Sequence, residues 1–317
     1  MGYFVIQGMY CPQILQAAQA ALFECAFFMK ISVIIPTLNG EKQLDQLLCS
    51  LEGQSVQPDE IIVVDSASTD GTIAIASAPA LVQVISIQRS DFDHGGTRDM
   101  TLQQSSGDVV LFMTQDALPT DAHYIENLIA PFSDEQVAAV GGRQIAYPDA
   151  RPFEKAVRSF NYPAADRVWD KADIARLGVR AYLISDVCAA YRRSAYLAVG
   201  GFDHPIMTNE DMLMAQKLLQ AGYKLAYSGG ASVYHSHHFT LRQEYKRNHL
   251  IGWTMKHYEE RFGHAEEMGE GVKLAVNVVK SLLKQGHVLE CIPFAFNCAA
   301  RLLGNRAGRR AAGKEMA

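Results

Sequence analysis

The chain has 317 residues, of which 49% are hydrophobic, so it can bury the core of one large domain or of two ordinary ones. The formal net charge of −5 gives no reason to expect nucleic acid as a partner. The 6 cysteines are scattered without the spacing of a metal finger, which suits reduced thiols in a cytoplasmic protein.

Residues 1–29 form an N-terminal extension ahead of the first convincing strand. They lack the positively charged start and the small-residue cleavage site of a secretory signal. Met29 stands directly before that strand, so residues 1–28 are either part of the native protein or an upstream extension of the reading frame. No run of about 18 apolar residues occurs, so we expect no membrane-spanning helix.

Short apolar runs alternate with helical patterns from Ile31 onward. The runs that predict strands are 31–35, 61–64, 82–87, 109–113 and 137–141. Leucines at helical spacing predict a helix over 44–51, and helical stretches follow Asp70, Arg98 and Asp121. This alternation predicts an α/β fold with a mainly parallel central sheet flanked by helices.

The alternation lapses after residue 145 into a section that we expect to be rich in loops. It resumes with a strand at 187–191, a helix after Asp211 and a last strand at 224–227. Residues 241–317 are basic and have helical patterns, which predicts a helical C-terminal extension.

Polar residues follow the first two predicted strands, where a parallel sheet binds its ligands. They are Pro36, Thr37 and Asn39 after the first strand, and Asp65 and Ser68 after the second. A carboxylate there can accept a hydrogen bond from a pyrimidine imide, and hydroxyl groups can bond to a ribose or phosphate. The alternative is that these residues only cap a helix and close a turn.

Two further segments indicate a metal site and a catalytic base. The fourth strand leads to Gln115 and Asp116, and this carboxylate could hold a hard divalent cation against two phosphates. Asp211 opens a later helix, and His235 follows the last predicted strand. Together they predict a carboxylate and an imidazole that share one Mg2+ or Mn2+, with a second carboxylate free to act as a base. The alternative is that Asp116 only forms a cap and that the histidines are a surface feature.

In this order the segments resemble the family 2 glycosyltransferases, inverting enzymes with the A-type nucleotide-diphospho-sugar transferase fold. The resemblance covers residues 31–253. It is carried by VIIPTLN at 33–39, VVDSASTDGT at 63–72, GGFD at 200–203 and ED at 210–211. It implies that residues 30–240 are the catalytic domain, in which 30–145 bind the nucleotide sugar and 146–240 bind the acceptor.

The segment FDHGGTR at 92–98 is similar to the signature of the rhamnosyltransferase branch, whose donor is dTDP-L-rhamnose. Gly95 would let backbone amides approach a pyrophosphate, and His94 and Arg98 would add cationic or hydrogen-bonding groups. The alternative is a glycine turn before a helix that carries a surface arginine. The branch acts in surface polysaccharide synthesis, such as that of O-antigen or capsule.

The resemblance also implies roles for single residues. Asp65 would bind the base of the nucleotide, Asp116 and His235 the metal, and Asp211 would be the catalytic base. The nucleotide-sugar site would comprise Pro36, Thr37, Asn39, Asp65, Ser68, His94, Gly95, Arg98, Gln115 and Asp116, with Asp186 and Glu210 on the acceptor side. The Asp-x-Asp metal motif of the family is reduced here to its last carboxylate, which predicts weaker metal binding.

The expected partners are a nucleoside diphosphate sugar and a glycan or lipid-linked acceptor. The basic, aromatic C-terminal region suits a cytoplasmic protein that rests on the anionic inner face of the membrane, and a solvated helical face is the alternative. Transfer of a galactofuranosyl or hexosyl unit from a UDP donor stays open, as does a non-catalytic scaffold that binds nucleotide sugars. No GxGxxG follows the first strand, which excludes a nucleotide-cofactor oxidoreductase.

Overall fold

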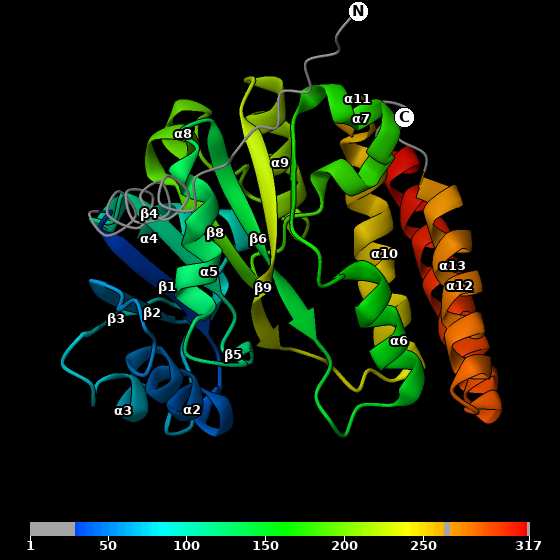
Figure 1. Ribbon diagram of the computed structural model, residues 1–317, viewed down its shortest axis with the longest axis horizontal. Coiled ribbons are helices and arrows are strands. Elements are labelled where there is room, and N and C mark those ends of the chain that lie inside the picture. Colours follow the sequence, from blue (N-terminus) through cyan, green and yellow to red (C-terminus); the bar gives the residue numbers. More distant parts are fainter. Residues whose placement is uncertain (1–28, 263–266, 316–317) are drawn as a thin grey trace, which may run out of the picture.

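The computed structural model describes residues 29–262 and 267–315, so the expectation for residues 1–28 lies outside the described residues. Figure 1 shows a central sheet with helices on both faces and a group of long helices at one side. The strands are β1 Ile31–Thr37, β2 Glu60–Asp65, β3 Val82–Ser86, β4 Val109–Met113, β5 Leu118–Pro119, β6 Val137–Ile145, β7 Arg167–Trp169, β8 Cys188–Arg192 and β9 Lys224–Tyr234. The helices are α2 Glu41–Glu52, α3 Thr72–Ala76, α4 His94–Gln104, α5 Tyr124–Ile129, α6 Pro152–Asn161, α7 Ile174–Leu177, α8 Arg193–Ala198, α9 Glu210–Gln220, α10 Leu241–His257, α11 Glu259–Phe262, α12 Glu267–Lys284 and α13 Cys291–Glu315.

The strands of the described residues form one sheet in the order β3-β2-β1-β4-β8-β6-β9-β5, with β7 paired to β9. The pairs from β3 to β4 are parallel, and β8 lies antiparallel between β4 and β6. The predicted α/β fold, with a sheet flanked by helices and a helical C-terminal region, is confirmed. The carboxyl ends of β1, β2 and β4 meet at one edge, where the predicted site residues begin.

One part of the sequence prediction is wrong. The section after residue 145, expected to be rich in loops, contains α6, which begins with Pro152 at its first turn and packs on α12. Phe153, Ala156, Val157 and Phe160 stand at helical spacing, so the sequence carried an amphipathic signal for this helix that the prediction did not use. The two strands that the sequence did not reveal, β5 and β7, have 2 and 3 residues, too few for a pattern.

Each face of the sheet has its own hydrophobic core. On one face the sheet packs against α2 and α5, through leucines such as Leu44 and Leu128. On the other face it packs against α4 and α9, through Leu102 and Leu213. The elements that carry the candidate site are therefore fixed by buried apolar contacts at their bases, while their ends meet at the edge of the sheet.

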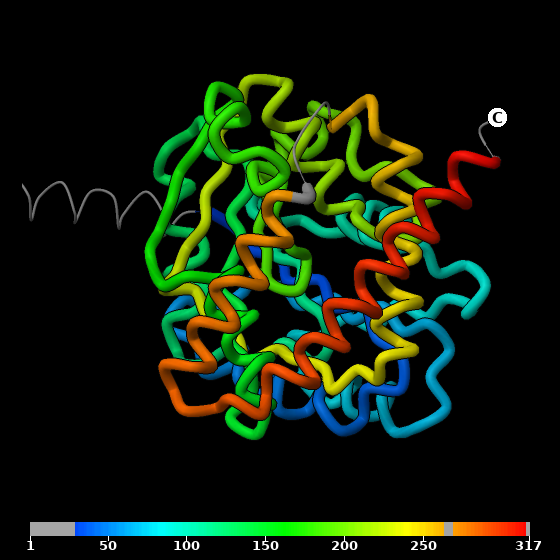
Figure 2. Tube along the Cα trace, turned by 90° about the vertical axis from the view of Figure 1, so that its right-hand side faces the viewer, coloured from blue at the N-terminus to red at the C-terminus, as the bar shows by residue number. Residues whose placement is uncertain are grey.

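The backbones of the C-terminal helices α10 and α13 approach each other closely. A methyl group added at Gly308 of α13 would overlap the carbonyl oxygen of His249 in α10, and one at Gly252 would overlap that of Asn305. Figure 2 shows α12 and α13 running along the outer surface of this side of the molecule. Phe153 of α6 packs with apolar residues of both helices, so the extension is joined to the sheet domain. Among the described helices, none is long and apolar enough to cross a membrane.

The close packing of α10 on α13 predicts that Gly308→Ala destabilises the protein. The overlap should cost about 1–3 kcal/mol, more than the roughly 1 kcal/mol that alanine gains over glycine in a helix. Gly313→Ala is the matched control on the same helix, because no atom lies within 4 Å of its added methyl group. Urea unfolding followed by circular dichroism should show a lower midpoint for the first variant only, and equal midpoints would contradict this packing.

Candidate active site

The predicted residues after β1 and β2 lie together and bond to one another. Asp65 is fully buried, and its carboxylate accepts hydrogen bonds from the Ser68 backbone at 2.9 Å and the Thr37 hydroxyl at 3.4 Å. Asn39 has a positive φ of 49°. Its backbone N–H donates to Ser68 Oγ at 2.8 Å, and its side-chain oxygen accepts from the Thr69 backbone at 2.9 Å. These hydrogen bonds fix the loops after β1 and β2. That the same residues contact a nucleotide remains a prediction.

Gln115 joins the end of β4 to the first of these loops. Its side-chain oxygen accepts from the Leu38 backbone N–H at 2.9 Å, and its amide nitrogen donates to the Leu38 carbonyl at 3.2 Å. Pro36 lies inside β1, in register with Val64 of β2. Gln115 thus positions the loop after β1. The next residue in the chain is Asp116.

The N-terminus of α4 is anchored to the loop before α9. Asp93 caps the helix by accepting from the Gly96 N–H at 2.6 Å, and its other oxygen accepts from the Ile206 N–H at 2.7 Å. A methyl group at Gly95 would overlap the carbonyl oxygen of Asp203. Close packing of backbone on backbone therefore accounts for glycine here, besides the predicted approach of a pyrophosphate.

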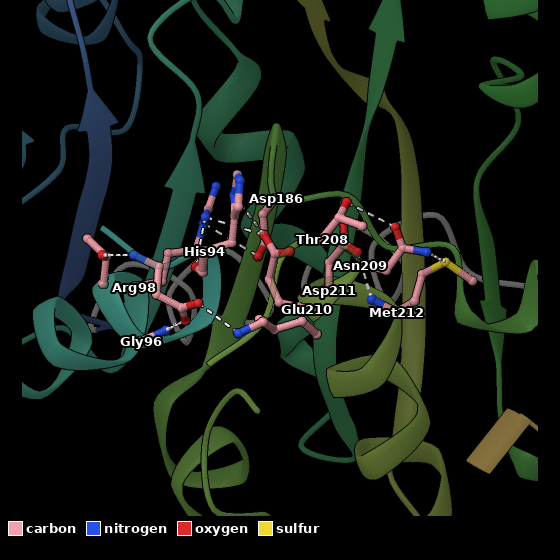
Figure 3. A network of polar contacts seen from close by, with 12 residues as sticks. His94, Gly96, Arg98, Asp186, Thr208, Asn209, Glu210, Asp211 and Met212 are labelled. Atoms are coloured by element: carbon pink, nitrogen blue, oxygen red, sulfur yellow. Dashed lines mark hydrogen bonds and ion pairs between the residues drawn. The ribbon is translucent and has the colours of Figure 1, made fainter. Parts of the chain in front are cut away.

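Arg98 lies inside the protein, 4% exposed, so the alternative of a surface arginine is wrong. Its guanidinium group is 3.6 Å from the Asp186 carboxylate and 3.3 Å from that of Glu210. It also donates to the His94 carbonyl at 2.9 Å. Figure 3 shows these side chains reaching toward one another from α4, the approach to β8 and the start of α9. All these contacts are internal, so Arg98 holds two carboxylates in place.

Asp186 is 3% exposed and accepts a hydrogen bond from the Tyr191 hydroxyl at 2.8 Å. Burial raises the pKa of Asp186 to about 7, and the positive charge of Arg98 opposes that shift. Glu210, also buried, is 3.8 Å from His94 Nδ1. Both carboxylates support Arg98, and their predicted contact with an acceptor stays a prediction.

Asp211 follows Glu210 in the first turn of α9. Arg98 pairs with Asp186 and Glu210 and forms no ion pair with Asp211 among the described contacts. One of its oxygens accepts from the Met212 N–H at 2.7 Å. Burial raises the pKa of Asp211 well above its usual value, and the negative charges of Glu210 and Asp186 raise it further. A carboxylate with a raised pKa is a stronger base, which suits the proton acceptor that the sequence predicts.

Asp211 borders a pocket of about 160 Å³. The aromatic rings of Tyr162 and Tyr227 line it, together with the guanidinium groups of Arg167 and Arg180. Aromatic faces and hydrogen-bond donors around a carboxylate suit a polyhydroxylated ligand. The predicted base is therefore placed where it could meet the hydroxyl group of such a molecule.

Asp116, His235 and His237 form the candidate metal site, with one ligand atom from each lying within 4.8 Å of the others. Asp116 Oδ2 is 3.6 Å from His235 Nε2 and 3.6 Å from His237 Nδ1. Burial lowers the pKa of both histidines, that of His235 well below its usual value. Both rings are therefore neutral near pH 7, the form in which imidazole binds a metal.

The hydrogen bonds of His235 point its second nitrogen at this site. His235 Nδ1 lies 2.9 Å from the Gln144 side-chain oxygen, and Arg158 donates to the same oxygen. Arginine can only donate, so this atom of Gln144 is an acceptor and His235 must donate from Nδ1. The lone pair of Nε2 then faces Asp116, as in metal-binding histidines whose other nitrogen is held by a hydrogen bond. The three residues fit a divalent cation.

The sequence prediction missed His237 as a ligand. The centres of the two imidazole rings are 4.6 Å apart, and His237 lies two residues after His235 in the sequence. That spacing was the available signal. His238, the next residue, points elsewhere, toward Asp149 and Glu154.

Known proteins that are similar to this chain include one protein family and two enzymes. The model of the family described as "Glycosyl transferase family 2" matches residues 32–200. O-antigen chain rhamnosyltransferase RfbN of Salmonella typhimurium is 39% identical over 290 residues, which cover 89% of this chain and 90% of that protein. O-antigen chain rhamnosyltransferase WbaN of Salmonella anatum is 38% identical over 288 residues, covering 88% and 89%.

The fold also has solved counterparts. The structure of the mannosyltransferase PcManGT from Pyrobaculum calidifontis, in complex with GDP-Man and Mn2+, matches with a TM-score of 0.63. It covers 93% of this chain and 98% of that one, at 17% sequence identity. This likeness shows that the two chains share an A-type fold.

The geometry of the three ligands predicts the effect of removing each. We expect His235→Ala and His237→Ala to weaken Mn2+ binding by at least about tenfold, because even groups that only support a ligand contribute roughly 10- to 100-fold. His238→Ala is the control, since that histidine lies outside the cluster. Calorimetric titration with Mn2+ measures the affinities, and unchanged affinity in His237→Ala would exclude it as a ligand.

Proposed function

The chain belongs to glycosyl transferase family 2, and we propose that it transfers L-rhamnose from dTDP-L-rhamnose to a glycan or lipid-linked acceptor in bacterial surface polysaccharide synthesis. The observation that carries the proposal is the similarity to two O-antigen rhamnosyltransferases over almost the whole chain. The segment at 92–98, which resembles the rhamnosyltransferase branch, supports the choice of donor.

The reaction is a single displacement at the anomeric carbon. The Asp211 carboxylate takes the proton of an acceptor hydroxyl, whose oxygen forms a bond to that carbon on the side opposite the leaving group. The bond from the carbon to the diphosphate breaks, and the nucleoside diphosphate departs with its electron pair. The configuration at the anomeric carbon is thereby inverted.

The protein's own groups prepare this step. Arg98 fixes Glu210, which fixes the first turn of α9 and so the direction of Asp211. The pocket with Tyr162 and Tyr227 receives the acceptor sugar, so that one of its hydroxyl groups meets the base. Asp65 and the loops after β1 and β2 bind the thymidine part of the donor.

Asp116, His235 and His237 would hold the divalent cation of the donor site, Mg2+ or Mn2+. Two imidazole ligands favour Mn2+, since Mg2+ prefers oxygen ligands. When bound, the cation supplies positive charge beside the diphosphate.

The role of Asp211 predicts the behaviour of Asp211→Asn. Transfer from dTDP-L-rhamnose should fall on the order of 100- to 10,000-fold, while the affinity for dTDP stays the same. In the wild type, kcat/KM should rise with pH as the Asp211 carboxyl loses its proton through its raised pKa. The variant lacks that carboxyl and should lose this rise. Turnover near that of the wild type would exclude Asp211 as the base.

The C-terminal helices also support a peripheral position on the cytoplasmic face of the membrane. Large apolar side chains are exposed there: Leu289 is 81% exposed, and Ile292 and Phe296 of α13 are each 60% exposed. Exposed lysines and arginines on the same helices include Lys280 and Arg306. Apolar side chains that enter the headgroup region, with basic ones contributing about 1 kcal/mol each on anionic lipid, are typical of surface binding.

Flotation with liposomes tests this surface. Ile292→Ser combined with Phe296→Ser should abolish flotation with vesicles of phosphatidylglycerol and phosphatidylcholine. Deleting α13 is a poorer test, because α13 packs against α10 and its loss would disturb the fold. The control combines Ile73→Ser and Leu197→Ser, which are exposed on α3 and α8. Equal flotation of both variants would contradict membrane binding through this face.

A further inference from the structure

A second pocket lies between α6, α10, α13 and the segment after β9. It measures about 110 Å³, against the roughly 10–15 Å³ that one water molecule needs on the same measure. Its lining residues are Phe153, Glu154, Val157, Arg158, Ser236, His237, Phe239, Glu244, Arg247, Asn297 and Arg301. His237 belongs both to this lining and to the candidate metal site.

Three arginines from three helices meet at this pocket. They are Arg158 of α6, Arg247 of α10 and Arg301 of α13. Among the contacts of the described residues, none of the three forms an ion pair with a carboxylate. Arg158 donates to Gln144, and Arg247 lies over the Phe239 ring, 5.7 Å from its centre. Three like charges held this close favour an anionic ligand.

The two carboxylates of the lining have other partners. Glu244 accepts hydrogen bonds from the side-chain amides of Asn297 at 3.3 Å and Asn248 at 3.2 Å. Glu154 accepts from the Arg151 backbone N–H at 3.3 Å. Neither carboxylate reaches a guanidinium group of the pocket, so the positive charge there is not cancelled by direct contact.

The pocket adjoins the one that contains Asp211. Arg158 lines the arginine pocket, and its guanidinium group lies over the ring of Tyr162, 5.8 Å from its centre. Tyr162 in turn lines the pocket of Asp211. The two pockets are therefore separated by this contact between Arg158 and Tyr162.

We propose that Arg158, Arg247 and Arg301 form a phosphate-binding pocket for the acceptor, and that it holds the diphosphate joining the acceptor glycan to a lipid carrier. The assignment to the acceptor rests on the proposed function. Two observations favour the acceptor over the donor. The helices of the pocket lie at the side of the molecule away from β1, β2 and α4, where the nucleoside of the donor is predicted to bind (Figure 1), and His237 places the pocket beside the cation of the donor site. Phe153 and Phe239 line the pocket together with the arginines and offer a lipid chain an apolar surface.

Farnesyl diphosphate, a short soluble polyprenyl diphosphate, is the probe. Calorimetry in the presence of EDTA should show binding to the wild type and at least tenfold weaker binding to Arg247→Gln combined with Arg301→Gln. Arg158 is left intact because it supports Gln144 and His235. The control is Arg242→Gln combined with Arg310→Gln, which removes the same charge from the same two helices outside the pocket. It should bind the probe as the wild type does.

Binding of dTDP with Mn2+ should be equal in all three proteins, which also shows that the variants are folded. The proposal is overturned if the wild type does not bind farnesyl diphosphate, or if the pocket variant binds it as well as the wild type. Loss of dTDP binding in the pocket variant alone would assign the arginines to the donor instead. Equal affinity for inorganic pyrophosphate and farnesyl diphosphate would exclude a lipid-linked ligand. Because rhamnose appears in none of these titrations, failure of rhamnosyl transfer would leave their result unaffected.

Discussion

The buried ion pairs of Arg98 are the constraint on which the arrangement of the site depends. A guanidinium group that is 4% exposed must be paired, and here the partners are Asp186 before β8 and Glu210 at the start of α9. Removing one partner of such a pair typically costs about 3–5 kcal/mol, because the remaining charge is left buried. The ion pairs therefore fix α4, the segment before β8 and the start of α9 relative to one another. Asp211 takes its position from these elements, and burial together with the neighbouring carboxylates raises its pKa.

A second chain of contacts links the base to the metal site. Arg158 donates to Gln144, and Gln144 accepts from His235, so the orientation of this imidazole depends on α6. Arg158 also lies over Tyr162, which lines the pocket of Asp211. The predicted base and the candidate metal ligands are thus linked through Arg158, although they come from segments far apart in the sequence. This suits a displacement in which proton removal and departure of the diphosphate occur together.

The sequence predicted those parts of the fold and site that leave a local pattern. Apolar runs located β1, β2, β4 and β9, because a buried strand is apolar whatever its neighbours are. Asp116, Asp211 and His235 were predicted because each follows or opens a recognisable element. His237 was missed, since its place beside Asp116 depends on the path of the chain after β9, which no pattern in the sequence gives. The burial of Arg98 and Asp186, and the packing of Gly95 on Asp203, depend on contacts between distant segments, and no local pattern reveals them.

The proposed donor is tested most directly by calorimetric titration with dTDP-L-rhamnose, UDP-glucose and UDP-galactose, each with and without Mn2+. We expect dTDP-L-rhamnose to bind most tightly, and we expect this binding to require the cation. Preference for a UDP sugar would leave the family and the mechanism in place and contradict the assignment of rhamnose. Absence of binding by all three donors would contradict the account as a whole and favour a scaffold that has lost catalysis.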